Sequence, residues 1–119
     1  MRAYRLNSPG LDSLSMFELD VPKPGTGQLL VRLRAASLNY RDLMVAQDRY
    51  KLSELKFPLI PLSDAAGEVV AVGEGVTEFG VGDRVIGNFF QKWGTGTFDK
   101  EKGDSALGGA IDGVLREQI

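Results

Sequence analysis

The sequence predicts a mainly β fold, a partly open antiparallel barrel with one short helix. Short stretches of alternating apolar and polar residues recur along the chain, separated by turns rich in Gly and Pro. Only residues 39–47 change to a helical period. The 119 residues, 43% hydrophobic and 25% charged, are expected to form one domain over 1–119.

Three strands are expected in the first part of the chain. Arg2–Leu6 is the first and Leu14–Val21 the second, and each ends where Pro and Gly gather. Gln28–Ala36 is the clearest strand, because Leu30, Arg32 and Arg34 alternate with apolar residues on the odd positions. Arg32 and Arg34 should then face water, while a core should receive the odd-numbered residues Leu29, Val31, Leu33 and Ala35.

The helix is expected at Asn39–Gln47. Apolar residues there fit one to two helical turns, with Asn39 as the N-cap and Asp42 in the first turn. After the helix, Pro58 and Pro61 predict a stiff, extended link.

A hairpin, a long loop and the start of a last strand are expected in the second half. Asp64–Val72 has a strand pattern, and Gly67 inside it indicates close approach of another backbone. A turn at residues 73–76 leads towards a short strand at Arg84–Gly87. Asn88–Ala106 combines aromatic residues, glycines and charges without a period, so it is expected to be a long surface loop. Gly113–Ile119 begins a last strand.

The chain has no cysteine and no histidine. Disulfides are therefore excluded, as are zinc sites built from Cys and His. The net charge of -2, without a basic stripe, argues against nucleic acid and anionic membranes as partners. No apolar run is long enough for a signal peptide or a membrane helix, so a cytoplasmic location is expected.

Two segments carry candidate ligand-binding residues. Asn39 and Tyr40, at the start of the helix, offer hydrogen-bonding groups that do not titrate near neutral pH and can orient a carbonyl or an amide. Ser63 and Asp64 precede a strand and could line a cleft. The alternative is structural: an N-cap, a core aromatic residue and a surface ion pair in the first segment, and turn-stabilising side-chain bonds in the second.

Other motifs fail their tests. Residues 73–75 lack the third glycine of a dinucleotide-binding G-x-G-x-x-G, and no helical pattern follows them. Asp99, Glu101 and Asp104 lack the order of a calcium loop. A serine nucleophile would need a base such as histidine, which the chain does not contain.

Taken in order, several segments resemble the medium-chain dehydrogenase/reductase superfamily. Residues 31–42 are similar to its strand-to-helix segment and residues 58–73 to its next signature. Residues 81–85 are similar to its hairpin end, and residues 108–117 to its following strand. This co-linear match covers nearly the whole chain. It implies the GroES-like barrel that forms the catalytic domain of these enzymes.

The resemblance also implies the zinc-free branch of the superfamily. In zinc-dependent members, a Cys and a His in these segments hold the catalytic zinc. Here Asn39 stands at the Cys position, Ser63 at the His position and Asp64 at the neighbouring acidic position. The segment Asn88–Ala106 replaces the cysteine-rich lobe that holds a structural zinc. The chain is therefore similar to quinone oxidoreductases and enoyl or alkenal reductases, with no metal site.

In that branch the implied activity is hydride transfer between NADP or NAD and a quinone, an enone or enal, or an alcohol or carbonyl. The resemblance makes Asn39 and Tyr40 catalytic and cofactor-binding residues, with Asp42 and Ser63 also cofactor-binding. Tyr50 and Asp64 are implied to lie in the substrate cleft. The implied partners are a small-molecule substrate and, for the parent enzyme, a second copy in a homodimer.

The glycine-rich fingerprint of the superfamily's Rossmann domain is missing from this sequence. The resemblance thus implies a truncated barrel without the domain that binds most of the cofactor. Such a fragment is expected to be inactive and to leave a strand edge unpaired. The alternative is a stand-alone GroES-like interaction or small-molecule-binding module without catalysis. A co-chaperonin would be its extreme case, which a sevenfold ring would identify.

Overall fold

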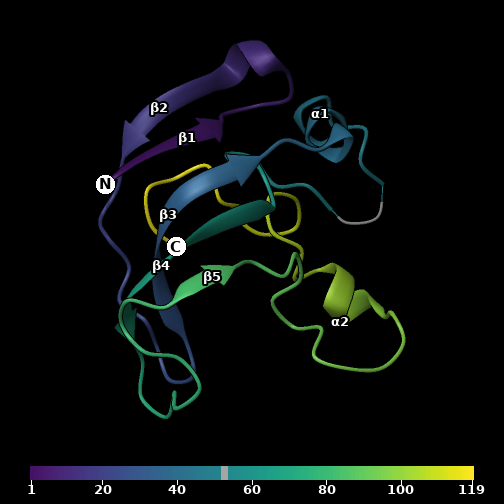
Figure 1. Ribbon diagram of the computed structural model, residues 1–119. Coiled ribbons are helices and arrows are strands. Elements are labelled where there is room, and N and C mark those ends of the chain that lie inside the picture. The colour runs from purple at the N-terminus through teal and green to yellow at the C-terminus, as the bar shows by residue number, and fades with distance from the viewer. Residues whose placement is uncertain (52–53) are drawn as a thin grey trace.

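The computed structural model describes residues 1–51 and 54–119, and strands dominate it (Figure 1). The fold is mainly β, as the sequence predicts. The predicted second strand is shorter than expected and ends at Glu18. In chain order the elements are β1 (Arg2–Leu6), η1 (Leu11–Ser13), β2 (Leu14–Glu18), β3 (Leu29–Ser37), α1 (Tyr40–Ala46), β4 (Asp64–Val72), β5 (Arg84–Ile86) and α2 (Lys100–Gly103).

The strands form two antiparallel sheets, β1-β2 and β3-β4-β5, which the segment 113–119 connects. The carbonyl of Leu115 accepts the N–H of Tyr4 at 2.9 Å, and the carbonyl of Glu117 accepts the N–H of Leu33 at 2.9 Å. The strand predicted to begin at Gly113 therefore lies between β1 and β3, although its pairings are isolated bridges. Over residues 1–51 and 54–119 the sheets stay open, in agreement with a partly open barrel.

The burial of β3 follows the predicted alternation only in part. Arg32 and Arg34 are exposed, as predicted. Leu30 is buried and Ala35 is exposed, the reverse of the prediction. The pairing of β3 with β4 shifts register between Leu30 and Val31 and again before Ala35. The first shift leaves one residue of β4 unpaired, and the second leaves Arg34 of β3 unpaired, which interrupts the alternation of β3 before Ala35.

Gly67 lies where β4 passes closest to β3, as the sequence predicts. It pairs with Leu33 on one side and with Val85 of β5 on the other. A Cβ atom at this position would overlap with the carbonyl oxygen of Arg32. The central strand therefore requires glycine here because of the neighbouring backbone, not because of an unusual φ.

The link that precedes β4 contributes to the core. Leu62, Leu107 and Val114 form a buried cluster, and partly buried residues of β3, β4 and the 113–119 segment pack against it: Leu33, Ala65, Leu115 and Ile119. Leu62 has a positive φ of 71°, which is unusual for a bulky residue. Gly108 and Gly113 both touch the backbone of Leu62, and a Cβ at either position would overlap with it.

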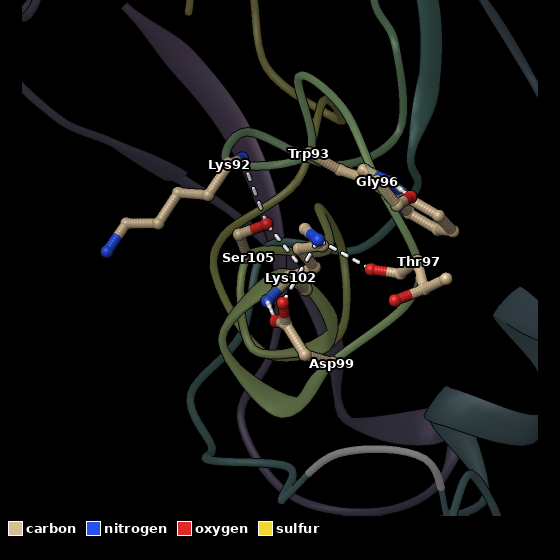
Figure 2. A network of polar contacts seen from close by, with 7 residues as sticks. All are labelled: Lys92, Trp93, Gly96, Thr97, Asp99, Lys102 and Ser105. Atoms are coloured by element: carbon tan, nitrogen blue, oxygen red, sulfur yellow. Dashed lines mark hydrogen bonds and ion pairs between the residues drawn. The ribbon is translucent and has the colours of Figure 1, made fainter.

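The segment Asn88–Ala106 differs from the predicted loop because it contains α2. The side chain of Asp99 caps this helix by accepting the N–H of Lys102 at 2.9 Å. Figure 2 shows Lys102 between Asp99 and Thr97: its Nζ forms an ion pair with Asp99 at 3.0 Å and donates to the carbonyl of Thr97. The sequence shows these residues only as a charged run, so their mutual contacts were not predicted.

Aromatic side chains of the same segment lie close to one another, with Phe90 and Trp93 half-buried and Phe98 53% exposed. The Phe90 ring lies 5.1 Å from the Trp93 ring and 6.4 Å from the Phe98 ring, centroid to centroid. The indole N–H of Trp93 donates to the carbonyl of Gly96 at 2.9 Å (Figure 2). We refer to residues 88–106 as the aromatic segment.

None of the helices in the described residues is long and apolar enough to cross a membrane. The longest of them, α1, has 7 residues.

Candidate active site

The corner between β3, α1 and β4 brings together most of the predicted site residues. Asn39 precedes α1 in an extended conformation, with φ -120° and ψ 153°, as an N-cap requires. Its backbone N–H donates to Oδ2 of Asp42 at 2.7 Å. The predicted cap and the predicted first-turn acid are both confirmed.

Asn39 also connects the helix to β4. Its Nδ2 donates to Oδ2 of Asp64 at 2.6 Å. Asp64 is the first residue of β4 and pairs with Ser37, the last residue of β3. An amide nitrogen carries two hydrogens, so one N–H of Asn39 binds Asp64 and the second can serve a ligand oxygen.

Asp42 is nearly buried beneath this corner, with 8% of its surface exposed. Burial raises the pKa of its carboxyl group, and the hydrogen bond from Asn39 and the charge of Arg41 offset part of that rise. One oxygen, Oδ1, is buried without a hydrogen-bond partner in the described part of the chain. The carboxylate therefore supports Asn39 from below and is not open to a ligand in this conformation.

Ser63 is fully buried, with 0% exposure, and its hydroxyl has no partner among the described residues. It directly follows Leu62, which is buried and has a positive φ. The predicted contact of Ser63 with a cofactor stays a prediction, because the hydroxyl does not reach the surface here.

The two tyrosines of the predicted site lie in different surroundings. Tyr40 is 75% exposed and is not the core aromatic residue of the structural alternative. Leu38 and Ile86 are also on the surface, each 81% exposed. Tyr50 is half-buried, with the guanidinium carbon of Arg41 4.6 Å from its ring centroid.

Sequence reasoning missed Arg41, for which the alternative offered only a surface ion pair. Its guanidinium carbon also lies 4.6 Å from the centroid of Phe89, in the aromatic segment. Its Nη1 donates to the carbonyl of Leu107 at 3.0 Å. Its Nε and Nη2 are buried without a partner in the described residues. No local pattern could reveal these contacts, because they join residues up to 66 positions apart.

The residues at the corner do not fit a zinc ion. Structural and catalytic zinc sites use thiolate, imidazole and carboxylate ligands, and this chain has neither Cys nor His. Over residues 1–51 and 54–119, no three potential metal-ligating acids gather in one place. The Asn39 amide is bonded to Asp64, and the Ser63 hydroxyl is enclosed.

Two surface hollows lie away from this corner. One, of about 400 Å³, lies between β1, β3 and residues 114–117, and the other, of about 580 Å³, lies over β3, β4 and β5. Neither is lined by the predicted site residues. At the corner, Asn39 and Tyr40 are exposed, whereas Asp42 and Ser63 are buried.

Comparison with known proteins places this geometry in a family. Residues 25–119 match the model of the alcohol dehydrogenase GroES-like domain. The chain is 45% identical over 109 residues to a zinc-type alcohol dehydrogenase-like protein of Schizosaccharomyces pombe, covering 91% of this chain and 31% of that protein. It is 41% identical over 78 residues to acryloyl-coenzyme A reductase of Metallosphaera sedula, covering 66% of this chain and 23% of the reductase.

A solved structure shares the fold over the whole chain. It is the cobalt- and zinc-bound thermostable alcohol dehydrogenase of Pyrobaculum aerophilum, which matches with a TM-score of 0.82 and 29% identity over 100% of this chain and 38% of that one. The chain thus spans between 23% and 38% of the length of these three relatives. The family match covers nearly the whole of β3 to β5 and the segment that joins the sheets, so this chain belongs to the alcohol dehydrogenase GroES-like domain family.

Proposed function

We propose that this chain forms the catalytic-domain part of an NAD(P)H-dependent oxidoreductase that works without zinc. The observation that carries the proposal is the Asn39 corner. Where the sequence resemblance puts two zinc ligands, the chain has an amide bonded to Asp64 and an enclosed hydroxyl. Neither group replaces the thiolate or imidazole that zinc prefers.

The named relatives support an oxidoreductase but differ in chemistry. Acryloyl-coenzyme A reductase is named for reduction of an activated C=C bond, which agrees with the proposed substrate class of enones, enals and quinones. The zinc-type relative and the cobalt- and zinc-bound structure favour metal-dependent chemistry. The residues of this chain decide whether it binds zinc, and the names of its relatives do not, because a metal site requires ligands and not only a fold.

The exposed groups of the corner suit stabilisation of an oxyanion. A bound nicotinamide would supply the hydride, and a conjugated substrate that accepts it gathers negative charge on its carbonyl oxygen. The second N–H of Asn39 and the hydroxyl of Tyr40 can donate to that oxygen. Asp64 holds the Asn39 amide in one orientation, so this donor needs little reorganisation.

Metal analysis combined with kinetics of the purified protein that carries this chain tests the proposal. We expect oxidation of NADPH or NADH by enals or quinones, no stoichiometric zinc, and no loss of turnover after treatment with a chelator. Bound zinc whose removal abolishes turnover would overturn the zinc-free assignment. Ligand binding without turnover would instead favour the stand-alone binding module.

A further inference from the structure

Arg41 joins parts of the molecule that are far apart in the sequence. It extends from the first turn of α1 to the Tyr50 ring, the Phe89 ring and the carbonyl of Leu107. Gly109 leaves room for the guanidinium, because a Cβ there would overlap with Nη2. One side chain therefore holds Tyr50, the aromatic segment and the chain at Leu107 together.

The way Arg41 is held indicates a role beyond stability. A buried charged donor without an acceptor is costly, and Nε and Nη2 are both in that state within the described residues. Among the same residues, the ion pairs belong to other side chains, so none of them offsets the cost of burying the Arg41 guanidinium. Only a flat guanidinium can contact both rings and still reach Leu107, so lysine is not equivalent here.

A chain of aromatic contacts continues from Arg41 into the aromatic segment. The Phe89 ring lies 4.5 Å from the Phe90 ring, which lies 5.1 Å from Trp93, centroid to centroid. Trp93 is the single tryptophan of the chain and is anchored on Gly96 in the network of Figure 2. Its fluorescence therefore reports the packing of the segment that Arg41 contacts.

We propose that Arg41 is a positioning residue that fixes the Tyr50 ring and the aromatic segment against α1. It acts through Tyr50, for which the sequence resemblance implies a place in the substrate cleft. The catalytic part of this inference rests on the proposed function, and the structural part does not. Arg41 thus couples the order of the aromatic segment to the position of the Tyr50 ring.

The first arm of the test uses Trp93 emission and needs no activity. Arg41→Met should shift the Trp93 emission to longer wavelength, because the Phe89 ring loses its contact with the guanidinium and water enters the aromatic segment. Arg41→Lys keeps the charge and should show the same shift to a smaller degree. Gly109→Ala should reproduce it by displacing an unchanged Arg41. Arg49→Met, which removes an exposed arginine just after α1, is the matched control and should leave the emission unchanged.

The second arm is a double-mutant cycle on the active protein. Arg41→Lys should lower kcat/KM about tenfold, mainly through KM, when Tyr50 is present. In a Tyr50→Ala background the same change should have less than about a twofold effect, because the two residues act as a unit. Equal effects in both backgrounds, or an unshifted Trp93 emission in Arg41→Met, would overturn the proposal. A protein without any turnover contradicts the proposed function, while the emission arm still decides on Arg41.

Discussion

Asn39 carries several tasks at once at the corner of the fold. Its backbone begins α1, its N–H binds Asp42, and its amide binds Asp64. The sequence predicts the first of these and places Asp42 in the first turn, because Asn before a helical pattern is a local N-cap signal. The bond from the Asn39 N–H to Asp42 was not predicted. The contact with Asp64 crosses 25 positions and could not be predicted from spacing.

Replacing Asn39 tests the proposed oxyanion donor. We expect Asn39→Ala to slow hydride transfer by roughly tenfold to a thousandfold, because the developing charge loses a fixed N–H donor. Single-turnover kinetics of NADPH oxidation measure this step apart from product release. Zinc content should be nil in both proteins. An unchanged single-turnover rate would remove Asn39 from the catalytic residues.

Asp42 should make stability depend on pH in an unusual direction. Burial raises the pKa of this carboxyl group above its ordinary value of 3.8. At pH values between the ordinary pKa and the raised pKa, the folded protein binds more protons than the unfolded chain. The stability is therefore fully present below the ordinary value and is partly lost as the pH rises through the raised pKa.

The Asp42→Asn variant removes this titration but keeps an oxygen that can accept the Asn39 N–H. We expect the free energy of unfolding of the variant, relative to that of the unsubstituted protein, to increase as pH rises from about 4 to about 7. Urea titrations over that range measure the difference. A difference that is constant or shrinks with pH would show that burial does not govern Asp42.

At the scale of elements, alternation predicts where strands occur better than which face each residue occupies. The bounds predicted for β1 and β4 agree with the structure. In β3, Leu30 is buried and Ala35 is exposed, and Ala35 follows a register shift that leaves Arg34 unpaired. Bulges depend on the partner strand, so the pattern of β3 alone does not contain them. The cap of α2 was missed because Asp99 lies within a charged run.

The close contact of β3 and β4 at Gly67 can be measured directly. Gly67→Ala should lower the free energy of unfolding by about 1–3 kcal/mol, because the new Cβ meets the Arg32 carbonyl and the strands must separate. Gly94→Ala is the control, since its Cβ would have no neighbour within 4 Å. Equal unfolding midpoints in urea for the two variants would contradict the close contact.

At the scale of the whole molecule, segment 113–119 holds the two sheets together. Its pairings with β1 and β3 join Ala3 to Arg116 and Arg32 to Gln118. Nε and Nη2 of Arg2 both donate to Oε1 of Glu117 and reinforce the first of these pairings, although both side chains are exposed, so the contribution of this contact is small. Turn signals predict that a strand begins at Gly113, but not which neighbours it joins, because those lie far away in the sequence.

The completeness of the site is also a property of the whole molecule. Among the candidate residues, Tyr40 is 75% exposed, whereas Asp42 and Ser63 are buried. Over these 119 residues the sequence has no dinucleotide-binding fingerprint. Catalysis by differential binding needs the cofactor and the substrate held together at this corner.

We therefore expect purified residues 1–119 alone to show no measurable NADPH-dependent reduction of quinones or enals. The corner supplies hydrogen-bond donors, but a proximity effect worth roughly 10⁵ M or more is lost when nothing holds the cofactor beside them. Absorbance at the nicotinamide wavelength, with a protein that contains this chain and spans the full length of its relatives as the positive control, measures the difference. Turnover by residues 1–119 that disappears in Asn39→Ala would contradict this expectation, since these residues would then bind the cofactor themselves.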